Sequence, residues 1–264
     1  MLRYCSLFSG SKGNSTYVGT SSCGVLIDAG VSAKRIESAL RERDVDARSI
    51  RAVLVTHEHT DHIAGLRVLC KRYGWPLIAS DGTLTAMVEF NKIDADRKMY
   101  CMQAGQKITL GDMQIEAFAT PHDSRESYGY RITSAQGRSV AVATDMGYVS
   151  PAVAESITGA DLVHIESNHD ITMLRNGPYP YPLKQRIAGE GGHLSNAACA
   201  DLLPQLLQSG ASRFVLAHLS EENNLPALAR RTSADTLNAV GAKEGTDYLL
   251  DVASPVGQRP LVYL

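Results

Sequence analysis

A dense group of side chains able to bind metal lies in the run Thr-His-Glu-His-Thr-Asp-His at residues 56–62. Its spacing is His-x-His-x-Asp-His, formed by His57, His59, Asp61 and His62. Imidazole and carboxylate groups are ligands that Zn²⁺, Mn²⁺ and iron accept in proteins, and so many of them in so short a run can serve two adjacent ions. The plainer alternative is a polar turn capping a helix through Asp61, but histidine is a poor choice for a helix cap. The run therefore predicts a metal site.

Four further candidate ligands share one feature, because each stands at or just after the end of an expected strand. They are Asp28, His122, Asp145 and His218. An α/β protein gathers its site where strand ends meet at a common edge of a sheet. Taken singly, each of these residues could equally be a turn former or a satisfied polar group. Together with the histidine run, they form an ordered pattern along the chain.

The elements that must position these residues alternate between strands and helices. Strands are expected at 2–8, 24–28, 51–56, 113–119, 127–132, 139–144, 162–165 and 213–217. Helices are expected over 32–43, from the histidine run to about residue 73, and from Ser195 onward, where Pro204 predicts a kink or a short interruption. This order indicates an α/β fold with sheets sandwiched between helices. No repeat or linker divides the sequence, so we expect one domain over residues 1–264.

Composition excludes several classes of protein. The 264 residues are 44% hydrophobic and carry a net charge of −2, which argues against disorder and against a basic tail that would grip nucleic acid. An apolar run of about 18 residues and a signal peptide are both missing, so we expect no membrane association. Five scattered cysteines without a Cys-x-x-Cys motif favour a reducing cytoplasm over a disulfide framework.

Over essentially the whole chain, the order of these motifs resembles the five motifs of the metallo-β-lactamase fold. The resemblance implies an αββα sandwich with two divalent metal ions, Mn or Zn, whose bridging water would give the attacking hydroxide at neutral pH. It implies three sets of ligands: His57, His59 and His122 for one ion, Asp61, His62 and His218 for the second, and Asp145 as the bridge. Asp28 would orient the ligands without binding an ion itself. No cysteine stands where classical β-lactamases often carry one, which argues against antibiotic hydrolysis.

Two segments, Leu162–Glu166 and Gly192–Ala198, resemble parts of the tRNA 3′-processing nucleases of this fold. In those enzymes a glutamate and a histidine together protonate the leaving alkoxide, which a phosphodiesterase needs because an unprotonated sugar oxygen leaves poorly. The resemblance assigns this role to Glu166 and His193. The alternative is that Ser195 caps a helix and His193 merely precedes it. Asp61, Glu166 and His193 are thus the candidate catalytic residues.

As a whole chain, the sequence resembles the YycJ/WalJ family of bacterial proteins of this fold. The resemblance is carried by Phe8–Ser15, Glu166–Asp170, and Leu183–Ile187 shortly before Gly192–Asn196. It implies a manganese-dependent 5′→3′ exonuclease acting on double-stranded DNA in the cytoplasm. Two alternatives stay open: a small-molecule hydrolase, of the cyclic-nucleotide phosphodiesterase or glyoxalase II type, and a metal-binding scaffold without catalysis.

The candidate contacts to a nucleic acid are polar or basic residues near these motifs, because phosphates dominate such affinity. They are Ser9, Lys12, Asn14, Lys184 and Arg186, with Arg175 as a further candidate. The loop 9–15 could cradle a phosphate through backbone N–H groups or be an ordinary tight turn. The tyrosines of the loop 177–182 could stack on bases or pack on their own prolines. His164 and His169 are expected to be structural. Oligomeric state cannot be predicted from the sequence.

Overall fold

The computed structural model describes residues 1–256 and 260–264, and these form two compact units. The first unit comprises Met1–Ala119, Ser124–Ser139 and Ser254–Leu264. The second comprises Thr120–Asp123 and Val140–Ala253. No helix formed by the described residues is long and apolar enough to cross a membrane.

The first unit contains a seven-stranded sheet in the order β14-β1-β2-β3-β4-β5-β6. Its strands are β1 (Arg3–Phe8), β2 (Ser15–Gly19), β3 (Gly24–Ile27), β4 (Ile50–Leu54), β5 (Leu77–Ala79), β6 (Met99–Cys101) and β14 (Val262–Tyr263). The strands from β14 to β3 pair antiparallel, and those from β3 to β6 pair parallel. Every residue of β2 and β3 is buried, as expected where helices cover a sheet.

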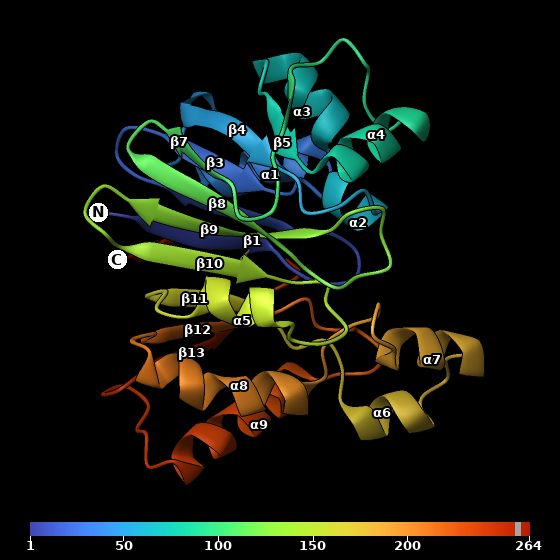
Figure 1. Cartoon of the computed structure of the whole chain (residues 1–264), viewed down its shortest axis with the longest axis vertical. Helices are drawn as coiled ribbons and strands as arrows, with labels where there is room; N and C mark the ends of the chain where they lie inside the picture. The colour runs from blue at the N-terminus through green and yellow to red at the C-terminus, as the bar shows by residue number, and fades with distance from the viewer. Residues whose placement is uncertain (257–259) are drawn as a thin grey trace. The chain divides into compact units, whose positions relative to one another are not determined.

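The same unit carries its helices and an antiparallel meander. The helices are α1 (Ala33–Arg41), α2 (Thr60–Ile63), α3 (Leu66–Tyr73) and α4 (Asp81–Glu89), with a 3₁₀ turn at Ala47–Ser49 (Figure 1). The meander is β7 (Lys107–Leu110), β8 (Met113–Ala119) and β9 (Tyr128–Ser134). Ile36 and Leu40 of α1 pack with Leu26, Val53 and Leu69 in one hydrophobic cluster.

The second unit is built on four parallel strands in sequential order, β10 (Ser139–Ala143), β11 (Leu162–Glu166), β12 (Arg213–Ala217) and β13 (Leu249–Val252). Its helices are α5 (Pro151–Ile157), α6 (Ile171–Asn176), α7 (Tyr181–Ala188), α8 (Asn196–Gln208) and α9 (Pro226–Ala239). Helix α8 contacts α9, and α9 contacts β13 (Figure 1). Parallel order brings the carboxyl ends of β10, β11 and β12 to one edge.

The strands predicted before the candidate ligands are present, most of them within one or two residues of the expected bounds. One helix prediction was wrong in detail. The helix expected from the histidine run to residue 73 is divided at Gly65. The N–H of Gly65 donates to Ala29 O at 2.8 Å. A Cβ at this position would lie only 2.3 Å from Val31 O. Of the kink or short interruption expected at Pro204, the interruption is not found, because α8 runs unbroken from Asn196 to Gln208.

Candidate metal centre

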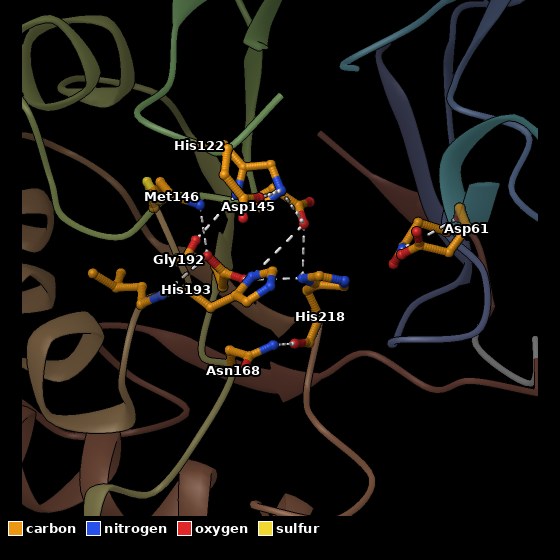
Figure 2. A network of polar contacts seen from close by, with 12 residues as sticks. Asp61, His122, Asp145, Met146, Asn168, Gly192, His193 and His218 are labelled. Atoms are coloured by element: carbon orange, nitrogen blue, oxygen red, sulfur yellow. Dashed lines mark hydrogen bonds and ion pairs between the residues drawn. The ribbon is translucent and has the colours of Figure 1, made fainter. Parts of the chain in front are cut away.

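Three predicted site residues have a left-handed backbone at or near a strand end. Asp28 (φ 62°) follows β3, Asp145 (φ 57°) lies just beyond β10, and His218 (φ 54°) follows β12. For a side chain other than glycine this conformation costs roughly 1–2 kcal/mol. At His218 the amide of Asn168 supports the turn, because its Nδ2 donates to His218 O at 2.8 Å (Figure 2). Such strain is typical of functional sites, where the surrounding structure holds the side chain in place.

In the first unit, His62 is fully buried and is oriented by a carboxylate. Its Nδ1 lies 2.7 Å from Asp28 Oδ2. Asp28 also accepts hydrogen bonds from Thr56 N and Thr56 Oγ1, both at 2.8 Å. Burial raises the pKa of Asp28, whereas His62 and the two bonds from Thr56 act in the opposite direction. A proton on Nδ1 leaves the imidazole lone pair on Nε2, which is how a metal-binding histidine is oriented.

The other histidines of the run lie against His62. The ring of His57 is 4.1 Å from that of His62 and 4.6 Å from that of His59, measured between centroids. His57 Nδ1 lies 3.0 Å from Thr56 Oγ1, so this one hydroxyl contacts both Asp28 and His57. The intervening Glu58 does not join the cluster, since its Oε1 accepts from Arg125 N at 2.8 Å. We call Asp28, Thr56, His57, His59, Asp61 and His62 the first cluster.

The loop 9–15 holds one side of the first cluster in position. Asn14 Nδ2 lies 3.1 Å from His62 Nε2 and 3.3 Å from Asp61 Oδ2, and Asn14 N donates to Asp61 O at 2.8 Å. The Asn14 amide also closes its own loop by bonding to Gly10 N and Gly10 O. Gly30 N donates to Asn14 O at 2.7 Å, and a Cβ on Gly30 would lie 1.6 Å from Asp61 O. Asn14, predicted as a substrate contact, therefore hydrogen-bonds to the candidate ligands.

In the second unit, Glu166 at the end of β11 is fully buried and accepts hydrogen bonds on both oxygens. Its Oε1 lies 2.8 Å from His193 Nδ1 and 2.9 Å from His218 Nδ1. Its Oε2 accepts from Met146 N at 2.9 Å and from Leu194 N at 3.2 Å. Burial alone would raise the pKa of Glu166, but the charge of His193 and the bonds from both histidines hold that pKa well below its ordinary value. Glu166 is therefore a buried carboxylate that orients two imidazoles.

Asp145 and His122 complete this group. Asp145 Oδ1 lies 3.2 Å from His218 Nδ1 and 3.9 Å from His122 Nε2. His122 Nδ1 lies 3.1 Å from Gly192 O, which directs its Nε2 toward Asp145 (Figure 2). Burial lowers the pKa of His122 and so favours the neutral ring that a metal requires. We call His122, Asp145, Glu166, His193 and His218 the second cluster; one ligand atom from each of its last four residues lies within 4.8 Å of the others.

The predicted substrate contacts lie in different surroundings. Ser9 is buried and Lys12 is exposed on the loop 9–15. On α7, Lys184 Nζ donates to Arg175 O at 2.8 Å. The guanidinium of Arg186 pairs with Asp123, with Nη2 3.0 Å from Oδ1, and Asp123 N donates to Gly191 O. Asp123 thus ties the segment next to His122 both to α7 and to the loop before His193.

The chemistry of the donors fits divalent cations. Each cluster supplies imidazole nitrogens and carboxylate oxygens, and in each cluster a buried carboxylate holds at least one ring through Nδ1. Sequence reasoning missed Thr56 and the backbone N–H groups of Met146 and Leu194. Thr56 could have been noticed as the polar residue that ends the strand before the histidine run. The two backbone donors carry no signal in the sequence.

The model of the beta-lactamase superfamily domain matches residues 24–219, and the chain belongs to this superfamily. Within it, the sequence is 39% identical over 262 residues to the exodeoxyribonuclease WalJ of Streptococcus pneumoniae serotype 2, covering 98% of this chain and 97% of that protein. It is 36% identical over 264 residues to the exodeoxyribonuclease YycJ of Bacillus anthracis, covering 100% and 99%. The resemblance to the YycJ/WalJ family is confirmed.

Solved structures agree on the fold. The metallo-β-lactamase fold protein YhfI of Bacillus subtilis matches with a TM-score of 0.71 at 18% identity, covering 96% of this chain and 97% of that one. A diphosphatase of the PhnP family matches with a TM-score of 0.66 at 20% identity, covering 99% and 97%. The predicted α/β class and metallo-β-lactamase αββα fold are therefore confirmed.

Proposed function

We propose that this protein is a metal-dependent exonuclease that degrades double-stranded DNA from the 5′ end. Membership of the superfamily and similarity to proteins named exodeoxyribonuclease identify a metal-dependent hydrolase and support a nuclease acting on DNA. The observation that supports phosphodiester hydrolysis is the Glu166–His193 pair, in which a fully buried carboxylate lies 2.8 Å from His193 Nδ1. We further propose the cytoplasm as its place of action, which agrees with five cysteines that are all free thiols.

We propose two divalent ions, Mn or Zn, held by the ligands that the family resemblance implies. His57, His59 and His122 would bind one ion, Asp61, His62 and His218 the other, and Asp145 both. Ions bound there would supply hydroxide at neutral pH and stabilise negative charge on the phosphate. Asp28 would fix the orientation of His62, as its hydrogen bond to Nδ1 supports.

In the second cluster, His193 supplies the proton that the reaction requires, and Glu166 orients it. Hydroxide attacks the phosphorus, and the bond from phosphorus to the 3′ oxygen of the terminal nucleotide breaks. His193 gives its Nε2 proton to that oxygen, while Nδ1–H stays bonded to Glu166. The negative charge of Glu166 stabilises the protonated imidazole before the transfer. The products are a 5′-mononucleotide and a strand shortened by one nucleotide that bears a new 5′ phosphate.

The test is a nuclease assay with Mn²⁺ on a 5′-phosphorylated duplex labelled at each end in turn. We expect stepwise release of mononucleotides from the 5′ end and no release by the double variant Asp61→Ala/His62→Ala. His193→Ala should keep its metal content and lose about 10²- to 10⁴-fold in rate. The surface substitution Asp112→Asn serves as the control and should cleave normally. An intact duplex, combined with cleavage of a small phosphodiester or thioester, would overturn the DNA assignment, and metal binding without any turnover would indicate a scaffold.

A further inference from the structure

A cavity of about 470 Å³ lies beside His193, and the described residues that line it all belong to the second unit. Its walls come from α6, α7 and the first turn of α8, with Ile171, Leu174 and Ala188 as apolar lining. Sites for small ligands have volumes of roughly 300–1,000 Å³, mostly apolar walls and a few polar groups. The cavity is therefore large enough for one small organic molecule and too small for a duplex.

His169 is a buried polar side chain in the lining of the cavity. It lines the cavity, is only 3% exposed, and its Nδ1 has no hydrogen-bond partner among the described residues. Its backbone is held in place, because Asn196 N donates to His169 O at 2.8 Å. A buried polar atom left without a partner costs about 1–3 kcal/mol. The imidazole ring is nonetheless a polar part of the cavity wall.

The charged groups in the lining are basic. Arg175 and Lys184 line the cavity, and no aspartate or glutamate among the described residues does. The hydrogen bond from Lys184 Nζ to the backbone oxygen of Arg175, at 2.8 Å, joins α7 to α6 and holds the Lys184 ammonium beside the residue that carries the second cation. Two cations over apolar walls favour an organic anion, and a phosphate ester is the anion that arginine and lysine bind well.

We propose that this cavity binds the 5′-terminal nucleotide of the strand being degraded, an inference that rests on the proposed exonuclease function. His193 protonates the 3′ oxygen of the departing nucleotide, so that nucleotide lies on the His193 side of the broken bond. The cavity adjoins His193. Arg175 and Lys184 bind the terminal 5′ phosphate, and the nucleoside packs on Ile171 and Leu174. Because the cavity admits a single nucleotide, the strand must present a free end, which makes the enzyme an exonuclease.

The test is calorimetric binding of deoxyadenosine 5′-monophosphate to the full-length protein, with Mn²⁺ and again in EDTA. We expect binding in both conditions, at least tenfold weaker in Arg175→Gln/Lys184→Gln and weaker in His169→Phe, which keeps the ring and removes its nitrogens. Deoxyadenosine without phosphate should bind at least tenfold more weakly than the monophosphate. Arg231→Gln, which removes an exposed cation on α9 outside the cavity, should bind like the wild type. Urea denaturation of each variant shows whether it is folded.

The outcomes separate this inference from the proposed function. Binding that requires Mn²⁺ and is unchanged in the double variant would place the nucleotide elsewhere and overturn the inference. Suppose that 5′-hydroxyl and 5′-phosphate ends are degraded at equal rates and that the double variant is as fast as the wild type. This result would support the exonuclease function and overturn the proposed nucleotide pocket. Binding of the mononucleotide through Arg175 and Lys184, with every duplex left intact, would support the nucleotide pocket and overturn the exonuclease function.

Discussion

The two clusters reach similar donor sets by different construction. In the first, all residues but Asp28 come from the run 56–62, and the Asp28 carboxylate bonds to one imidazole. In the second, the residues come from five separate segments of the chain, and the single carboxylate of Glu166 bonds to two imidazoles and two backbone N–H groups. A contiguous run needs only local structure to bring its ligands together, whereas a dispersed set depends on one buried group that joins distant segments.

The largest expected effect is at Glu166. Glu166→Ala leaves the N–H groups of Met146 and Leu194 without their acceptor and removes the carboxylate between His193 and His218. Removing one side of such a buried charged network costs about 3–5 kcal/mol. We expect a loss of this size in the free energy of unfolding, measured by urea denaturation in EDTA.

Glu166→Gln is the matched control for that substitution, because it keeps the shape and one acceptor oxygen. The loss in the free energy of unfolding should be smaller, about 1–3 kcal/mol, because the amide NH₂ of glutamine faces a hydrogen-bond donor at the place where the carboxylate oxygen accepts. If Glu166→Ala were as stable as the wild type, Glu166 would not be the group that joins the dispersed segments.

A smaller effect is expected where the first cluster depends on close backbone approach. Gly30→Ala would place a Cβ 1.6 Å from Asp61 O and 2.6 Å from Asn14 N, both of which are backbone atoms. Overpacking of this kind costs about 1–3 kcal/mol, and it must displace Asp61. We therefore expect lower stability together with weaker metal binding, measured by denaturation and by competition with a metal indicator.

The control is Gly74→Ala, at a left-handed position with open space around it. This substitution should cost about 1 kcal/mol through backbone strain alone and leave metal affinity unchanged. Equal metal affinity in both variants would show that the contact between Gly30 and Asp61 does not position the ligand.

Much of the first cluster was predictable from sequence, because its spacing is local and its strand, β4, is apolar except for Arg51. Glu166 was found only through family resemblance, since a glutamate at the end of a strand carries no signal of its own. The contact of Asn14 with Asp61 joins positions 47 residues apart and depends on how the sheet assembles. The strands β5 and β6 have three residues each, too few to show a periodic pattern.

The role of Asp28 sharpens the contrast between the clusters, because it acts on one ring only. Asp28→Asn preserves the left-handed backbone, which asparagine tolerates, and removes the negative charge beside His62 Nδ1. Loss of such a partner typically costs 10- to 100-fold in metal affinity. We expect that loss in a metal-indicator titration, with a change in the free energy of unfolding smaller than that of Glu166→Ala. A metal affinity equal to that of the wild type would contradict the orienting role.

The smallest effect is expected at Asp112, a surface counterpart of Asp28. Both carboxylates accept from a threonine hydroxyl, and Asp112 accepts from Ser22 Oγ and Thr20 Oγ1, each at 2.7 Å. Burial raises the pKa of Asp28, whereas these hydrogen bonds, first from Ser22 and then from Thr20, lower the pKa of the accessible Asp112. A lowered pKa in the folded state means that the ionised group stabilises the fold above its unfolded pKa, and that this contribution is lost as pH falls through the folded value.

Asp112→Asn should therefore cost about 0.5–1 kcal/mol at pH 7, a small value because the site is accessible to solvent. The difference between wild type and variant should shrink as pH is lowered from 5 through the ordinary aspartate pKa of about 3.9. Urea denaturation of both proteins at pH 7, 5 and 4 measures it, because the titration of the other carboxylates cancels in the difference. A difference that grew on acidification would mean that Asp112, like the buried Asp28, has a raised pKa, and that exposure does not distinguish the two carboxylates.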